Sequence, residues 1–279
     1  MALTVSLTVV GQGQPLLFLH SSLSSHRQWL PLVNELKSQF QCILVDLQGY
    51  GAAGSRWQPS PASLQPQQYC MAEESKPLLV ELAALNLTSP ITLIGHSFGG
   101  ALALHLAQSQ QIAVKQLILF EPVVFHLLKP ENYQPQQTQR NEAETLLSEI
   151  HQLAAKLPTL SEHAAAECFI DYWQSHGFFA ELPRKMQSTL AQQVKKVPFD
   201  FAALISEPCT LLDYQYLQQP ILLMTGQSSR RSATFLAEQL ASHMPNCQLR
   251  RVSSGHMGPV THADVINPII VEYLSQSEI

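Results

Sequence analysis

Short apolar runs alternate with amphipathic stretches along most of the chain, and this alternation predicts a repeated strand–helix order. The apolar runs read as buried strands and lie at residues 16–20, 42–46, 91–95, 115–120, 220–225 and 248–252. Stretches with apolar residues at helical spacing lie at residues 28–40, 69–85, 98–108, 232–243 and 264–274. We therefore predict an α/β fold, with a mostly parallel central sheet and helices on both faces.

The first residues predict a strand rather than a targeting segment. The stretch MALTVSLTVV has no basic residue and is followed at once by the turn-forming sequence GQGQ. Residues 3–10 and 16–20 are predicted to be the two arms of a β-hairpin across that turn. No apolar run reaches the ~20 residues that a membrane-spanning helix needs. We expect neither a signal peptide nor a membrane partner.

One long interval breaks the strand–helix alternation. Between residues 122 and 219 no convincing strand pattern occurs, and helical patterns follow one another at residues 141–157, 161–176, 182–196 and 198–212. This interval lies between two predicted core strands. We therefore expect a core formed by residues 1–121 and 220–279, with residues 122–219 inserted as a helical cap.

Composition narrows the class of protein. The chain has 279 residues, a formal net charge of -5 and 13% charged residues, without a basic stripe, so a nucleic-acid partner has no electrostatic support. The cysteines are scattered, odd in number and without a CxxC spacing, which favours free thiols and a cytoplasmic location. The histidines show no metal-binding spacing beside an acid, so no metal site is predicted.

The most informative motif is GHSFG at residues 95–99, which fits G-x-S-x-G between a predicted strand and a predicted helix. The turn is so tight that the positions two before and two after the serine must lack side chains, as Gly95 and Gly99 do. The hydroxyl of Ser97 is then exposed above the sheet. The next backbone N–H, from Phe98, lies at a helix N-terminus where it can stabilise an oxyanion. This arrangement predicts a nucleophilic serine.

With these residues, the sequence resembles the α/β-hydrolase family over nearly its whole length. FLHSS at residues 18–22 stands where the family has a strand ending in His-Gly, and the match implies that the N–H of Ser22 is the second oxyanion donor. Ser21 replaces the usual glycine there. DLQGYG at residues 46–51 is similar to the family's D-x-x-G-x-G turn. The loop GHMGP at residues 255–259 resembles the family's catalytic histidine loop, which implies that His256 is the base, with His262 as the alternative.

The sequence departs from the family at the catalytic acid. The usual G-x-x-D segment reads GQSSRR at residues 226–231 and contains no carboxylate. A second position known in the superfamily lies directly after the strand that follows the nucleophile helix, and there the chain has Glu121. We expect Glu121 to orient His256. A purely structural role for Glu121, in a salt bridge or at the start of the insertion, stays open.

The resemblance implies a serine hydrolase that cleaves a small carboxylic ester or related acyl substrate without a cofactor. Two alternatives stay open, namely a C–C bond hydrolase or lyase that uses the same triad, and a catalytically silent receptor of the same fold. The substrate is expected to be a partly apolar small molecule. Aromatic residues of the insertion either line its pocket or pack the cap onto the core; they are Phe125, Tyr172, Trp173, Phe178 and Phe179.

Overall fold

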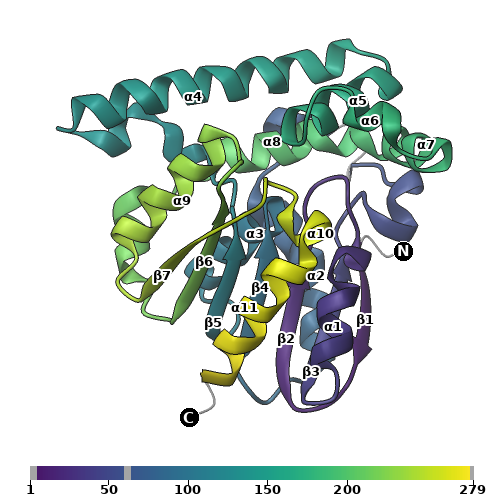
Figure 1. The fold of residues 1–279 in the computed structure, drawn as a ribbon, viewed down its shortest axis with the longest axis vertical. Helices are drawn as coiled ribbons and strands as arrows, with labels where there is room; N and C mark the ends of the chain where they lie inside the picture. Colours follow the sequence, from purple (N-terminus) through teal and green to yellow (C-terminus); the bar gives the residue numbers. More distant parts are fainter. Residues whose placement is uncertain (1–4, 60–63, 277–279) are drawn as a thin grey trace.

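The computed structural model describes residues 5–59 and 64–276 and contains a central seven-stranded sheet (Figure 1). Its strands are β1 (Ser6–Val10), β2 (Gln14–Leu19), β3 (Phe40–Asp46), β4 (Ile91–His96), β5 (Val114–Phe120), β6 (Ile221–Gly226) and β7 (Cys247–Val252). Their order is β1-β3-β2-β4-β5-β6-β7, in which β1 is antiparallel to β3 and every other neighbouring pair is parallel. The predicted α/β fold with a mostly parallel sheet is confirmed.

Helices surround the sheet and fill the long interval between β5 and β6. The α-helices are α1 (Leu30–Leu36), α2 (Met71–Ala84), α3 (Phe98–Ser109), α4 (Gln137–Lys156), α5 (Glu162–Trp173), α6 (Phe178–Glu181), α7 (Arg184–Gln193), α8 (Val197–Ser206), α9 (Arg231–His243), α10 (Gly258–Thr261) and α11 (Ala263–Gln276). Short 3₁₀ turns are η1 (His26–Trp29), η2 (Gly51–Arg56), η3 (Pro66–Gln68), η4 (Phe125–Leu128), η5 (Pro130–Tyr133), η6 (Leu157–Thr159), η7 (Val194–Lys196) and η8 (Leu211–Tyr216).

Two apolar clusters cover the two faces of the sheet. Helices α1 and α11 contribute to one cluster, with Leu32 and Ile270 buried against strand residues such as Phe18. Helices α2, α3 and α9 contribute to the other cluster, which continues into the interval between β5 and β6. Within the described ranges, no helix combines the length and the apolar character needed to cross a membrane.

The predicted hairpin at the N-terminus is wrong. Strands β1 and β2 do not pair with each other, because β3 lies between them and pairs with both. The connecting turn lies close to the start of β3, and a Cβ on Gly11 would lie 2.3 Å from the carbonyl oxygen of Phe40. A glycine-rich turn between two apolar runs does not reveal whether a third strand separates them. The first two residues of the predicted strand 3–10 lie outside the described residues.

The interval between β5 and β6, all of which is described, contains helices and loops but no strand, and the four predicted helical patterns correspond to α4, α5, α7 and α8. In Figure 1 the helices α4 to α8 form a layer across one end of the sheet. Helix α8 also contacts α2 and α3 of the core. This layer brings residues that are far apart in the sequence next to the ends of β2, β4 and β5.

Candidate active site

Ser97 occupies the sharp turn between β4 and α3. Its backbone has φ 55° and ψ −117°, a strained conformation for a residue with a side chain. The turn is tight, because a Cβ on Gly95 would lie 2.6 Å from the carbonyl oxygen of Gly99. A Cβ on Gly99 would lie 2.4 Å from the carbonyl oxygen of Leu19, at the end of β2. The missing side chains therefore let the loop after β2 pack directly beside Ser97.

His256 lies in the loop between β7 and α10 and faces Ser97. Its Nε2 is 3.0 Å from Ser97 Oγ, while its backbone carbonyl accepts a hydrogen bond of 2.8 Å from Nε2 of His96. Burial lowers the pKa of His96 well below its usual range, so that this ring stays neutral and can accept at Nδ1 from Gln28. The alternative base, His262, is exposed and contacts Thr261 instead.

Glu121 follows β5 and completes a chain of hydrogen bonds. Its Oε2 lies 2.6 Å from Nδ1 of His256. Its Oε1 accepts from Thr225 Oγ1 at 2.8 Å and from the backbone N–H of Gly226 at 2.7 Å. Burial pushes the pKa of Glu121 upward, but the hydrogen bond and charge attraction from His256, with help from the Gly226 N–H, outweigh burial and hold this pKa below its ordinary value. In the family the acid usually follows the strand that corresponds to β6. Here the end of β6 instead supplies two hydrogen-bond donors to Glu121.

The structure thus brings Ser97, His256 and Glu121 together in the order that the sequence predicted. The backbone N–H of Phe98 stands at the N-terminus of α3. Ser22 lies in the loop after β2, whose first residue, His20, has its carbonyl oxygen 2.5 Å from where a Gly99 Cβ would stand. Ser21, in the usual glycine position, is fixed by Gln28, whose Oε1 accepts from the Ser21 N–H at 3.2 Å.

Aromatic side chains from the helical interval cover the site. The Trp173 ring stacks on the His256 ring with centroids 4.0 Å apart, and Phe125 stacks on Trp173 at 6.4 Å. Tyr172 lies instead beneath the guanidinium of Arg230. As a result, Ser97 is only 6% exposed. The helical interval therefore shields Ser97 and His256 from solvent.

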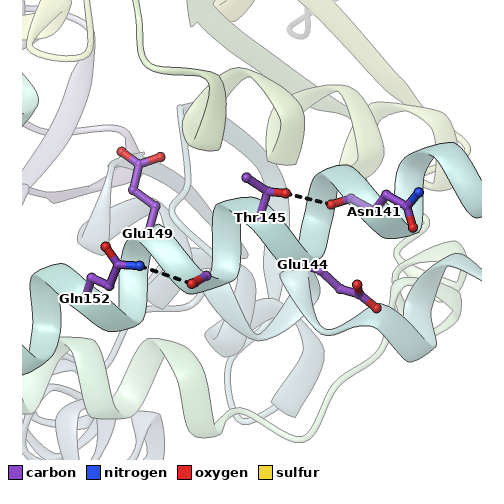
Figure 2. A pocket seen from close by; sticks show the side chains of 6 residues that line it. Asn141, Glu144, Thr145, Glu149 and Gln152 are labelled. Carbon is purple, nitrogen blue, oxygen red and sulfur yellow. Dashed lines mark hydrogen bonds between the residues drawn. The ribbon is translucent and has the colours of Figure 1, made fainter.

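A separate hollow lies on the long helix α4 (Figure 2). Its lining is polar, with internal contacts such as the 3.0 Å hydrogen bond from Thr145 Oγ1 to the Asn141 carbonyl. The residues that line it are Asn141, Glu144, Thr145, Ser148, Glu149 and Gln152. Neither Ser97 nor His256 lines this hollow, so we do not regard it as part of the candidate active site.

Comparison with known proteins identifies the family. The sequence profile of the α/β-hydrolase fold matches residues 14–263. The chain belongs to the α/β-hydrolase fold family. An esterase from Exiguobacterium antarcticum has the same fold, with a TM-score of 0.73 and 19% identity, over 97% of this chain and 95% of that chain.

Two curated relatives of this α/β-hydrolase match over shorter stretches. The coelenterazine h 2-monooxygenase of Renilla reniformis is 30% identical over 108 residues, which cover 39% of this chain and 32% of the relative. The cis-3-alkyl-4-alkyloxetan-2-one decarboxylase of Shewanella oneidensis is 29% identical over 117 residues, covering 42% and 35%. The matched part spans about a third of the length of these relatives. Both relatives are named as enzymes, which supports the view that this chain is also an enzyme.

Sequence reasoning missed two charged residues of the helical interval that lie next to the site. Lys196 and Asp200 are both buried, and Asp200 contacts the side chain of Ser22. Two signals were present in the sequence: the spacing of four residues, which is that of one helix face, and the place of Asp200 within the apolar run VPFDFAALIS. The spacing alone is common on solvated helices, but an acid inside an apolar run could have indicated a buried pair.

Proposed function

We propose that this chain is a serine hydrolase that cleaves a small carboxylic ester or related acyl substrate through an acyl-enzyme on Ser97. The observation that carries the proposal is the chain of hydrogen bonds from Ser97 through His256 to Glu121, with distances of 3.0 and 2.6 Å. A nucleophile in contact with a base, and a base oriented by a buried acid, is the arrangement that acyl transfer requires.

In the proposed reaction, Nε2 of His256 takes the proton of Ser97 Oγ as that oxygen attacks the substrate carbonyl carbon. The N–H groups of Phe98 and Ser22 hold the resulting oxyanion. When the carbon–oxygen bond breaks, the leaving alkoxide receives the proton from His256. Water then repeats these steps on the acyl-enzyme and releases the acid. Glu121 stabilises the charged imidazole and keeps Nδ1 protonated.

The direct test is substitution of Ser97 by Ala in the full chain. Removal of a triad nucleophile lowers turnover by on the order of 10⁴–10⁶, so Ser97→Ala should abolish hydrolysis of p-nitrophenyl esters and labelling by a fluorophosphonate. His256→Ala should show a comparable loss, whereas the exposed His262→Ala serves as the matched control. A Ser97→Ala variant that keeps more than about a tenth of wild-type turnover contradicts the proposal.

A lyase or ring-opening activity with the same residues is a second candidate, favoured by the likeness to the oxetan-2-one decarboxylase of Shewanella oneidensis. The substrate panel should therefore include a 2-oxetanone beside linear esters of increasing chain length. Loss of carbon dioxide without a detectable acid product would favour the lyase, and release of a hydroxy acid would favour the hydrolase. Absence of both turnover and labelling would indicate a receptor.

We further propose that residues 122–219 act as a cap, of which the part around Trp173 opens for the substrate. Trp173 lies on the His256 ring, and the nucleophile is almost completely covered. Both observations support a closed state in which the site is shielded from water.

A further inference from the structure

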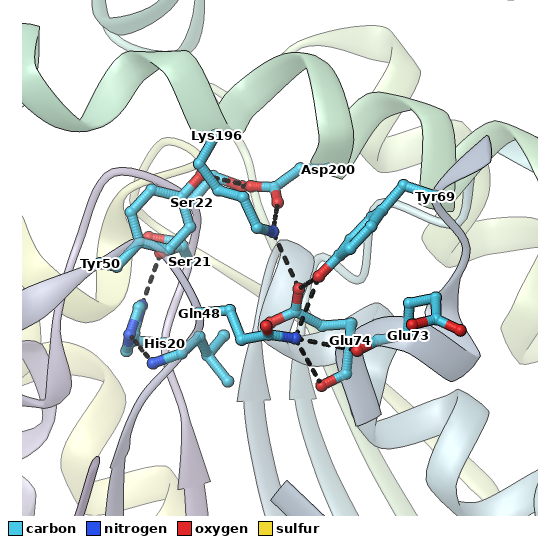
Figure 3. Close-up of polar contacts among 11 residues, drawn as sticks. His20, Ser21, Ser22, Gln48, Tyr50, Tyr69, Glu73, Glu74, Lys196 and Asp200 are labelled. Carbon is cyan, nitrogen blue, oxygen red and sulfur yellow. Dashed lines mark hydrogen bonds and ion pairs between the residues drawn. The ribbon is translucent and has the colours of Figure 1, made fainter. Parts of the chain in front are cut away.

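A buried lysine of the cap lies at its contact with the core, next to the proposed oxyanion loop. Lys196 has no exposed surface, and its Nζ forms ion pairs with Glu74 Oε2 at 2.8 Å and with Asp200 Oδ1 (Figure 3). Aromatic rings surround the ammonium, with centroids 4.9 to 5.7 Å from Nζ; they belong to Tyr50, Trp57, Tyr69 and Phe98. A charge in such surroundings is stable only when it is paired.

The core is shaped to receive this side chain. Gly49, in the D-x-x-G-x-G turn, has φ +81°, and a Cβ there would lie 2.7 Å from Lys196 Cγ. Burial alone would lower the pKa of Lys196, but the charges of Asp200 and Glu74 outweigh it and raise this pKa. The lysine therefore stays charged and, directly before α8, joins the cap to the turn after β3.

Asp200 connects this lysine to Ser22. Its Oδ1 accepts from Lys196 Nζ, and its Oδ2 accepts from Ser22 Oγ at 2.5 Å. The same Oδ2 also accepts from the hydroxyl of Tyr50. The side chain of Ser22, whose N–H is proposed to hold the oxyanion, is thus fixed by an anchored carboxylate of the cap.

Lys196 also offsets an unfavourable charge. A lone carboxylate beside Ser22 would repel the negative charge that develops on the substrate oxygen during acyl transfer. The ammonium lies on the other oxygen of Asp200 and 5.1 Å from the ring centroid of Phe98, the residue that carries the other proposed oxyanion donor. The pair can therefore hold the loop with little repulsion of the oxyanion.

We propose that Asp200, held by Lys196, is a positioning residue. By binding the Ser22 side chain, it places the backbone N–H of Ser22 as an oxyanion donor, so that the oxyanion site is complete only when α8 is docked on the core. This inference rests on the proposed function, since it assumes that acyl transfer takes place at Ser97. It gives α8 a part in the chemical step as well as in covering the substrate.

Glu74 provides a matched control for Asp200, because both carboxylates are buried and both pair with Lys196. Glu74 Oε2 accepts from Lys196 and from Tyr69, while among the described residues Oε1 has no hydrogen-bond partner. The amide of Glu74→Gln can keep both contacts with its oxygen. In Asp200→Asn both oxygens are in use, so the amide nitrogen must replace an acceptor, and the charge-assisted bond from Ser22 is lost or weakened.

The experiment measures kcat and KM on one p-nitrophenyl ester, and the rate of phosphonylation of Ser97, in full-length variants whose folding is checked by thermal unfolding. Misplacement of a catalytic group costs up to about 100-fold in rate. We expect Asp200→Asn and Ser22→Ala each to lower kcat by about 10- to 100-fold, with KM within about threefold of wild type. Glu74→Gln should stay within about twofold. The double variant Ser22→Ala/Asp200→Asn should lose no more than the worse single variant, because the two residues act through one contact.

The outcomes separate this inference from the proposed function. Equal losses in Glu74→Gln and Asp200→Asn, or losses that multiply in the double variant, would show that Asp200 acts on cap stability alone and would overturn the inference. Wild-type kcat in both Asp200→Asn and Ser22→Ala would overturn it as well. In each case, labelling of wild-type Ser97 would still support the hydrolase. Failure to label wild-type Ser97 would instead remove the function on which the inference rests.

Discussion

Glu121 and Asp200 are two buried carboxylates beside the same site, yet their pKa values move in opposite directions. Burial raises both. For Glu121, the contact with His256 and the Gly226 N–H outweigh burial, and the pKa falls below its ordinary value. For Asp200, the attraction of Lys196 is opposed by the nearby charge of Glu74, and the pKa stays raised. Burial alone therefore does not determine the charge of a carboxylate; the groups that share its partners do.

The two carboxylates also come from different parts of the molecule. Glu121 ends a core strand and is fixed by neighbours on β6, so its position does not depend on the helical interval. Asp200 belongs to α8, and its partner Ser22 belongs to the core. Under the proposed function, the core supplies the base and its acid, and the cap supports the oxyanion side. The predictions below test this division, from the largest effect to the smallest.

The largest effect is expected for Glu121→Gln. The amide keeps the shape of the side chain but removes the charge that stabilises His256 when it takes up a proton, and it favours the wrong tautomer. Turnover should fall by up to roughly 10⁴, measured as kcat on a p-nitrophenyl ester. The exposed acids Asp213 and Asp264 provide controls as Asp→Asn variants, which should keep wild-type kcat. Glu121→Gln activity near wild type would leave Glu121 with a structural role only.

Lys196→Met should produce the largest loss of stability. It leaves Asp200 and Glu74 buried without their cation, and the loss of one partner from a buried ion pair costs about 3–5 kcal/mol of unfolding free energy. Urea unfolding near neutral pH measures this change. Lys195→Met is the matched control, since Lys195 is adjacent and exposed, and it should change the free energy by less than about 0.5 kcal/mol. Similar values for the two variants would mean that the buried pair does not tie the cap to the core.

These residues also show what sequence can and cannot predict here. Ser97 was predictable because its motif is local, with the strand, the glycines and the helix all within one short stretch. His256 and Glu121 were implied by the resemblance to the α/β-hydrolase family, and both come after predicted parallel strands, whose ends meet at one edge of the sheet. The structure brings all three together; their catalytic roles stay predictions.

The contacts that the sequence did not predict join distant positions. Lys196 and Glu74 are 122 positions apart, and Ser22 and Asp200 are 178 apart. Neither pair lies within a motif, and no local pattern says which distant residue faces Lys196 or Asp200. The failure of the predicted hairpin has the same cause, because the strand that separates β1 from β2 comes later in the chain. Local patterns determined the elements, whereas tertiary packing determined these partners.

The opposite pKa shifts predict opposite pH dependences of stability. The pKa of Glu121 lies below its ordinary 4.5, so the stability that this group contributes is present above 4.5 and is lost as pH falls through the lowered pKa. The pKa of Asp200 lies above its ordinary 3.8, so its contribution is present below 3.8 and is lost as pH rises through the raised pKa.

Urea unfolding of the wild type, Glu121→Gln and Asp200→Asn between about pH 7 and pH 4 tests this contrast. As the pH falls, the stability advantage of the wild type over Glu121→Gln should shrink, while its stability relative to Asp200→Asn should increase. Lys196, Glu74, Tyr50 and Ser22 all act on Asp200, so the second slope reports the whole cluster. Two slopes of the same sign would contradict the contrast between the carboxylates.

The smallest effect is expected at the exposed contact between cap and core. Arg230, in the loop after β6, pairs with Glu149 of α4 at 3.3 Å, and both side chains are more than 40% exposed. Its guanidinium also lies 3.9 Å from the ring centroid of Tyr172, the neighbour of Trp173. An exposed ion pair contributes about 1 kcal/mol or less and is screened by salt, so this contact can yield where the buried Lys196 pair cannot. It is therefore suited to release Trp173 from His256 while α8 stays docked.

Arg230→Gln should accordingly lower the unfolding free energy by less than about 1 kcal/mol. If this contact helps to keep the cap closed, the variant should react with a bulky fluorophosphonate up to about fivefold faster, the factor that corresponds to 1 kcal/mol. Added salt should accelerate the wild type more than Arg230→Gln, which lacks one of two exposed pairs to α4 and keeps the pair from Arg231 to Glu142. Arg140→Gln is the control, since Arg140 pairs with Glu144 within α4, at similar exposure but without joining cap to core. Equal rates and equal salt responses in all three proteins would mean that cap opening does not depend on Arg230.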